Sequence, residues 1–196
     1  MSDIKSAREI AEEKVKQIGE ATEEERLKWK YSPQGEELAV RYLKEECNLL
    51  TELGQYPENV RPFIIEGANE VLTRNINLPK DESDKKTNRK AMDGIKTLKS
   101  DKVRVENTYS QIRNIFSHYT EQGGQQKQQA YESLKAEVEA RMQQEIQQQL
   151  GTFTGVKIDV EKHPQFQHEW RRILAQLDAQ YINLLNEYKQ ELAAIS

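Results

Sequence analysis

The sequence predicts an all-α protein: an elongated helical bundle of about six helices, built on a long antiparallel helical hairpin, with at most one short strand-like segment. Apolar residues recur every three or four positions through most of the chain, which is the spacing of one helix face. Only 36% of the 196 residues are apolar, against roughly 45–50% in an average domain, so the core is expected to be thin.

The first helix is expected near the N-terminus. Small apolar residues from Ile4 to Ile18 form a stripe at helical spacing. Gly19 can end this helix, and Thr22 with Glu25 can form a capping box for a continuation. A single helix and a helix in two parts are both consistent with this pattern.

Two further helices are predicted after a turn at residues 32–35, whose sequence is Ser-Pro-Gln-Gly. One ends at Gly54, and the next follows Pro57 or begins at Arg61. Gly67 lies inside the last pattern, where glycine costs about 1 kcal/mol relative to alanine. A close crossing of two helices is the expected reason for a glycine there.

A linker is predicted at residues 79–86, which are polar and rich in turn-forming types. It separates an N-terminal region of three helices, residues 1–78, from residues 87–196, which are expected to form the long hairpin and a C-terminal helix. The N-terminal region is near the lower size limit for folding alone, so we expect it to pack on the rest of the chain.

The long hairpin is predicted from two apolar stripes. Between residues 91 and 119, positions spaced alternately by four and three carry a residue able to pack at eight of nine places, which is the repeat of a coiled coil. A second stripe runs from Tyr131 to Leu150. Gly123 and Gly124 lie between them, and glycine can end a helix and reverse the chain. A continuous helix over 87–122 should therefore fold back at this glycine pair.

The expected hairpin specifies which residues face one another. Those whose numbers sum to about 247 should meet, as in the pair Phe116 and Tyr131. The same register places Lys102, the charged member of the first stripe, opposite Glu145. An ion pair between these two side chains can fix the register of the helices.

The stretch after the hairpin alternates apolar and charged residues at 156–160, a strand pattern without a second strand in the chain. Either it is an extended linker that lays Phe153 and Ile158 on the helices, or it pairs with the same segment of another copy. Pro164 then opens a long last helix, which is expected to cross the hairpin and supply its third member.

No residue cluster in the sequence specifies a catalytic, cofactor or metal site. The histidines His118, His163 and His168 lack a glutamate three residues before them, as a di-iron bundle requires, and are expected to be exposed or capping. Glu66 and Glu70 lie one helical turn apart and could act as acid and base or bind a metal, but such pairs are common on acidic helices. We therefore expect no enzyme, no cofactor and no small-molecule substrate.

The charges are segregated along the chain. Residues 85–104 carry eight basic and two acidic side chains, whereas residues 36–70 carry eight acidic and three basic ones. Faces of opposite sign can dock within one chain or across copies, and a solvated face without a partner is the alternative. The candidate partner-binding residues are basic residues of the first stretch: Lys85, Lys86, Arg89, Lys90, Lys96, Lys99 and Arg104.

These features favour a non-enzymatic helical interaction or scaffold protein that binds other protein and associates with itself, with a dimer as the favoured form. The alternative is a nucleic-acid-associated protein that uses the basic stretch at 85–104, which a net charge of −4 and the lack of interleaved aromatic residues disfavour. A single cysteine, Cys47, and the absence of eighteen consecutive apolar residues favour a cytoplasmic protein without a membrane segment.

Overall fold

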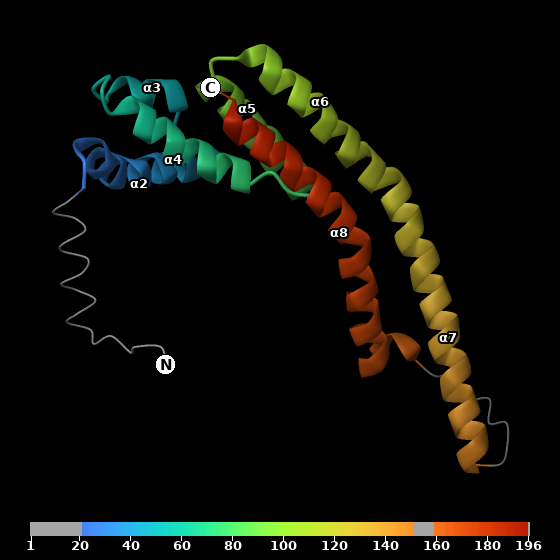
Figure 1. Cartoon of the computed structure of the whole chain (residues 1–196). Helices are drawn as coiled ribbons and strands as arrows, with labels where there is room; N and C mark the ends of the chain where they lie inside the picture. Colours follow the sequence, from blue (N-terminus) through green and yellow to red (C-terminus); the bar gives the residue numbers. More distant parts are fainter. Residues whose placement is uncertain (1–20, 151–158, 196) are drawn as a thin grey trace, which may run out of the picture. The chain divides into compact units, whose positions relative to one another are not determined.

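The computed structural model describes residues 21–150 and 159–195, and within them it contains helices and no β-strand (Figure 1). The prediction of an all-α helical bundle is confirmed. Within these two ranges, no helix combines the length and the hydropathy that a membrane-spanning segment needs. The helix expected between Ile4 and Ile18 lies outside the described residues.

Two compact units make up the chain. Unit 1 combines the residues up to Ile76 with residues 87–102, and unit 2 combines residues 77–86 with residues 103–195. One boundary falls inside helix α5 (Glu82–Leu98), so the stretch 79–86, expected to be a linker, is helical from Glu82 onward. The units thus divide the chain differently from the expected regions 1–78 and 87–196.

Unit 1 contains α2 (Glu23–Leu43), α3 (Leu49–Gly54), α4 (Arg61–Arg74) and most of α5. The capping box predicted at the start of α2 is confirmed, because Thr22 Oγ1 accepts from Glu25 N at 3.2 Å and Thr22 N donates to Glu25 Oε2 at 2.8 Å. The turn expected at residues 32–35 is wrong, since α2 continues through Pro33.

Glycines allow α2 and α4 to pack closely. A Cβ on Gly67 would lie 2.1 Å from the backbone oxygen of Ser32, and a Cβ on Gly35 would lie 2.0 Å from that of Ile64. Both distances are far below van der Waals contact, so only glycine fits at either position. The close helix crossing predicted from Gly67 is confirmed, and Gly35 is its counterpart on α2.

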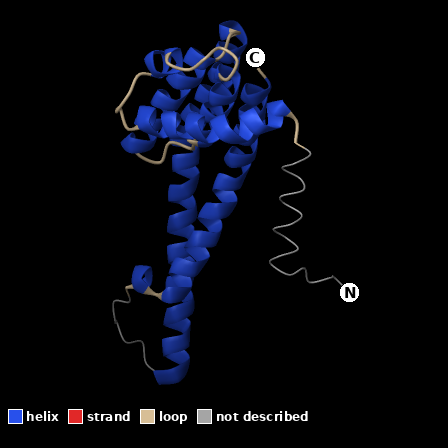
Figure 2. Ribbon diagram, turned by 90° about the vertical axis from the view of Figure 1, so that its left-hand side faces the viewer, coloured by secondary structure: helices blue, strands red, loops and turns tan. Residues whose placement is uncertain are grey.

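Unit 2 is built on one long rod. Helix α6 (Lys102–His118), a π-helical turn η1 (Tyr119–Gly123) and α7 (Gly124–Leu150) follow one another without a break, and α8 (Pro164–Ala194) lies alongside (Figures 1 and 2). The hairpin predicted at Gly123-Gly124 is therefore wrong, because both glycines are helical. The chain reverses between Leu150 and Pro164 instead.

The antiparallel partner of the rod is α8. The Tyr131 ring makes T-shaped contacts with Phe166 and Trp170, with ring centroids 5.4 and 5.2 Å apart, whereas the hairpin required it to meet Phe116. Tyr119 meets Tyr181 in the same way, at 5.2 Å. Contacting residue numbers in this unit sum to about 300, not to about 247.

The predicted continuous helix over 87–122 is interrupted at residues 99–101. Lys102 Nζ donates to Thr97 O at 3.1 Å, to Lys99 O at 2.5 Å and to Lys96 O. An ammonium group can donate three hydrogen bonds, so this one side chain satisfies carbonyls that the end of α5 leaves without helical partners. The expected pairing of Lys102 with Glu145 is wrong for this reason.

The far end of the rod has its own small core. Leu134 and Val138 of α7 are buried there with Phe166 of α8 and with Val160, which precedes α8. Val160 begins a 3-10 turn (Val160–Lys162), so the last residue of the expected strand pattern is not extended. The rest of that pattern, including Phe153 and Ile158, lies outside the described residues.

Candidate functional site

The π-helical turn Tyr119–Gly123 is the main irregularity of the rod. Such turns widen a helix by one residue and are frequent at functional sites. Thr120 Oγ1 donates to the carbonyls of Phe116 at 2.8 Å and Ser117 at 3.0 Å, which satisfies oxygens at the irregular turn. A Cβ on Gly123 would lie 3.5 Å from the side chains of Tyr119 and Tyr181, an ordinary van der Waals contact, so packing does not require glycine there.

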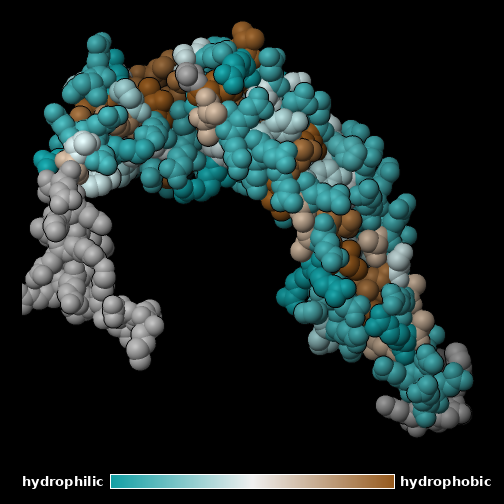
Figure 3. Space-filling model, viewed as in Figure 1, coloured by the Kyte–Doolittle hydropathy of each residue, from teal (hydrophilic) through white to brown (hydrophobic). Residues whose placement is uncertain are grey.

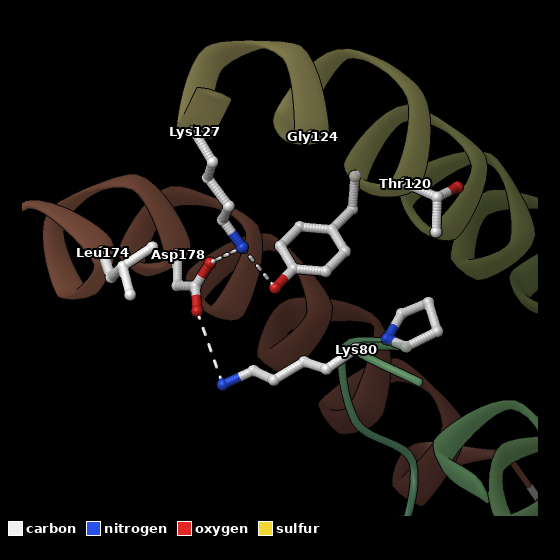
Figure 4. Close-up of a pocket in the computed structure, with 8 residues that line it drawn as sticks. Lys80, Thr120, Gly124, Lys127, Leu174 and Asp178 are labelled. Atoms are coloured by element: carbon white, nitrogen blue, oxygen red, sulfur yellow. Dashed lines mark hydrogen bonds and ion pairs between the residues drawn. The ribbon is translucent and has the colours of Figure 1, made fainter. Parts of the chain in front are cut away.

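One hollow beside this turn contains an ion pair between the rod and α8. Lys127 Nζ lies 2.8 Å from Asp178 Oδ1 and donates to the Tyr119 hydroxyl at 2.6 Å, while Lys80 Nζ lies 3.5 Å from Asp178 Oδ2 (Figure 4). Asp178 is buried, with 8% of its surface exposed. This ionic hollow has a volume of about 340 Å³ and is lined by Pro79, Lys80, Tyr119, Thr120, Gly124, Lys127, Leu174 and Asp178.

Both partners of the central pair are held in their charged forms. Burial alone would raise the pKa of Asp178, but the hydrogen bond and charge of Lys127, with help from Tyr119 and Lys80, outweigh it and lower the pKa. Burial alone would lower the pKa of Lys127, but its hydrogen bonds to Asp178 and Tyr119 outweigh burial and raise the pKa. The hollow therefore contains two ammonium groups and one carboxylate near neutral pH.

A second hollow, between α6 and α8, is lined by no lysine, arginine, aspartate or glutamate. His118 Nδ1 lies 2.9 Å from the hydroxyl of Tyr181, and Leu184 of α8 is 42% exposed. The volume is about 420 Å³. We call it the amide groove, because four amide side chains surround its apolar members; it is lined by Gln111, Asn114, Ile115, His118, Gln126, Gln180, Tyr181, Leu184 and Tyr188.

Helix α8 has more apolar surface than the rod covers. In the space-filling view, apolar residues follow the line where α8 meets α7, among polar residues that cover most of the visible surface there (Figure 3). Six apolar or aromatic residues of α8 are spaced alternately by four and three, and none of the six is fully buried. This α8 seam consists of Trp170, Leu174, Leu177, Tyr181, Leu184 and Tyr188.

The seven basic residues predicted to bind a partner are distributed over both units. Lys85, Lys86 and Arg104 belong to unit 2, and Arg89, Lys90, Lys96 and Lys99 belong to unit 1. Along α5, positions 85, 89 and 96 share one helix face, because they are four and eleven residues apart. The structure therefore places three of the seven side chains on one face of α5. The other four do not share that face.

Several of these cations already have partners. Lys85 Nζ lies 2.6 Å from Glu82 Oε1, and Lys90 Nζ lies 4.4 Å from the centre of the Tyr42 ring. Lys99 is only 9% exposed, and burial lowers the pKa of its ammonium group. These three residues contribute to the local structure, so they are less available to a binding partner than the sequence suggested.

The residues considered for acid–base or metal chemistry are engaged elsewhere. Glu66 pairs with Lys28 at 2.6 Å, and Glu70 pairs with Arg74 at 2.5 Å. His163 caps α8, where its Nδ1 accepts from Gln165 N at 3.3 Å, as expected for a capping histidine. Across residues 21–150 and 159–195, no three His, Cys, Asp or Glu side chains are grouped so that they could hold a metal ion.

Sequence reasoning missed the ion pair at the ionic hollow. Lys127 and Asp178 are about fifty residues apart, so no local spacing connects them. A signal was nevertheless present, because Asp178 is the only charged residue between Arg172 and Glu187. A lone carboxylate in such a stretch requires a cation from elsewhere in the fold if it is buried.

Comparison with known proteins gives a family but no activity. Residues 50–194 match the model of a family described as a family of unknown function, DUF6657. This span contains α4 to α8 and therefore every residue of both hollows. No curated protein and no solved structure matches the chain.

Proposed function

The chain belongs to this family of unknown function, and we propose that it is a non-enzymatic helical interaction protein that associates with itself through α8, with a dimer as the favoured form. The α8 seam is the observation that carries this proposal. Alternation of four and three residues keeps one stripe directed at a partner helix in a coiled coil. Trp170 and Tyr181 of the seam pack against Tyr131 and Tyr119 of the rod, but none of the six members is fully buried, so the seam retains some apolar surface for a further helix.

The amide groove, which includes Tyr181, Leu184 and Tyr188 of the seam, favours a second copy of the chain as the partner. In a two-fold symmetric contact the same surface of each copy takes part, so a charged residue near the symmetry axis would face the same charged residue of the other copy. Amide groups both donate and accept hydrogen bonds and can pair with themselves. Gln111, Asn114, Gln126 and Gln180 therefore suit a self-complementary surface, even for a chain with a net charge of −4.

The cytoplasm is the compartment that we propose for this association. Cys47 is the single cysteine of the chain and is a free thiol. Burial is the main cause that raises the pKa of this thiol, so it remains protonated and less reactive. A lone, partly buried thiol suits a reducing compartment.

The nucleic-acid alternative at residues 85–104 has weaker support. Lys85, Lys90 and Lys99 are engaged or buried in the chain itself. Phosphate-backbone binding depends on several free cations acting together. Among the described residues, no contact favours nucleic-acid binding over self-association. Nucleic-acid binding therefore stays a prediction from the sequence.

Two matched substitutions on α8 test the proposal. Leu184 and Ile182 are 42% and 43% exposed. Because they are two positions apart on the helix, their side chains point in directions about 200° apart. Leu184→Asp places a charge in the α8 seam, whereas Ile182→Asp places the same charge at equal exposure outside it. Light scattering coupled to size exclusion, over about 10 μM to 1 mM full-length chain, gives the mass of each variant.

We expect twice the mass of one chain for the wild type and for Ile182→Asp, and a shift toward one chain for Leu184→Asp. Circular dichroism should show equal helix content in all three, because both positions are partly exposed. A wild type that remains a single chain at the highest concentration would reject self-association. If both variants shifted equally toward the mass of one chain, the α8 seam would be excluded as the specific contact surface.

A further inference from the structure

Gly124 lies inside the long rod at a position where packing does not require glycine. A Cβ on its neighbour Gly123 would make ordinary contacts with two tyrosine side chains at 3.5 Å, whereas a Cβ on Gly124 would meet nothing within 4 Å. Glycine inside a helix costs about 1 kcal/mol relative to alanine. Gly54 also has open space around it, but it ends α3, where glycine is ordinary.

The space that Gly124 leaves open belongs to the ionic hollow, of which it is a lining residue. Close approach of a bound molecule to the backbone is a common reason for glycine in a regular element. The adjoining π-helical turn brings Tyr119 and Thr120 to the same hollow. A helix irregularity and an unexplained glycine thus coincide at one cavity.

The charge of the hollow favours an anion. Its lining contains the ammonium groups of Lys80 and Lys127 and the single carboxylate of Asp178, an excess of one positive charge. Lys127 Nζ donates to the Tyr119 hydroxyl and lies 2.8 Å from Asp178 Oδ1, so this ammonium group is largely engaged within the protein. Lys80 is held at 3.5 Å with 64% of its side chain exposed, so its donors remain accessible.

The remaining walls favour an apolar body on that anion. The lining includes the aliphatic side chains of Pro79 and Leu174 and the side chain of Tyr119. A volume of about 340 Å³ is at the lower end of the range for small-molecule sites. The size and lining together suit a compact molecule with one charged end.

We propose that the ionic hollow binds a small organic monoanion, with its carboxylate on the exposed ammonium group of Lys80 and its apolar body over Gly124. The hollow shares Leu174 with the α8 seam, but the variants that test binding, at Lys80 and Gly124, lie outside the seam, so the result for binding is read separately from the result for self-association. Binding requires no chemical step and no metal.

Matched acids and amides test the charge requirement. Hexanoate and benzoate are titrated into the full-length chain by isothermal calorimetry, each beside its neutral amide, and inorganic phosphate is titrated separately. We expect at least one acid to bind with a Kd of about 1 mM or tighter and at least about tenfold more tightly than its amide. Phosphate should bind more weakly than that acid.

Two variants locate the binding. Lys80→Gln removes an exposed ammonium group and should raise the Kd of the acid by about tenfold. Gly124→Leu fills the hollow with a good helix former, whose Cβ meets no neighbour, and should abolish binding. Lys162→Gln, at a lysine with 84% of its side chain exposed outside the hollow, is the control and should bind like the wild type.

Absence of binding by both acids would overturn the proposal. Equal binding of an acid and its amide, or tighter binding of phosphate, would overturn the ligand class. If Lys80→Gln bound the acid with unchanged affinity, the binding site would lie outside the hollow. This conclusion does not depend on whether Gly124→Leu folds.

Discussion

Asp178 of α8 and Lys127 of α7 form a largely buried ion pair, with 2.8 Å between Asp178 Oδ1 and Lys127 Nζ. Their side chains are 11% and 23% exposed. A buried charge without its partner is costly, so the pair penalises any sliding of α8 along the rod. The pair therefore gives the antiparallel helices a defined register, which apolar packing alone specifies less strictly.

Asp178→Asn should lower the free energy of unfolding by about 3 kcal/mol, because it leaves Lys127 buried without its counter-charge. Urea denaturation followed by circular dichroism measures the loss. The double variant Lys127→Met with Asp178→Leu replaces the pair with apolar groups and should recover most of the stability. Asp159→Asn is the control, since the ion pair of Asp159 with Lys162 is exposed and its loss should leave stability unchanged.

The same pair predicts a pH dependence. The folded pKa of Asp178 lies below its usual value of 3.8, so its contribution is fully present above that value and is lost as the pH falls through the folded pKa. The difference in the free energy of unfolding between the wild type and Asp178→Asn should be constant from about pH 5 to 8 and shrink below about pH 4. Urea denaturation at each pH tests this; a difference that grew at low pH would contradict the lowered pKa.

Gly67→Ala should destabilise the protein by about 3 kcal/mol or more, because its Cβ would lie 2.1 Å from the backbone oxygen of Ser32. The helices α2 and α4 would have to move apart, and backbone atoms cannot relax as a side chain does. Gly54→Ala is the matched control at a position with open space, and it should be neutral or slightly stabilising. Thermal unfolding of both variants separates the two effects; equal melting temperatures would exclude the close crossing.

Tyr109→Ala should destabilise by about 3–5 kcal/mol, since Tyr109 is only 2% exposed in α6. Removing a buried aromatic ring costs its transfer free energy and leaves a cavity. Val103→Ala on the same helix is the control, because Val103 is 71% exposed. A loss below about 1 kcal/mol for Tyr109→Ala would place the ring outside the core.

Local features of the fold could be predicted because each depends on neighbouring residues. The capping box of Thr22 and Glu25, the capping by His163 and the start of α4 at Arg61 follow from hydrogen bonds or dihedral angles within a few positions. The close crossing at Gly67 was also predictable, because the helical pattern continued past a residue that weakens helices. Apolar spacing indicated the buried faces of α6 and α7 for the same reason.

The candidate site was predictable only in part. Tyr181, Leu184 and Tyr188 belonged to the expected apolar stripe of the last helix, but their partial exposure depends on how far the rod covers that stripe. Lys127 and Asp178 carried no shared signal along the sequence, since a pair between distant helices depends on register. The basic stretch at 85–104 was visible as a charge pattern, but its division between α5 and α6 and between the two units was not.

Sequence by itself determined that this protein is helical and which side of each helix is apolar, because both follow from residue spacing along a regular backbone. The tertiary structure alone decided where the chain turns back. The glycines at 123 and 124 are compatible with a helix end or with a continuous helix, and the continuous form is the one whose residues Tyr119 and Tyr131 pack against Tyr181 and Phe166 of α8. These contacts between residues far apart in the sequence, and not local preference, kept the rod continuous and made α8 its partner.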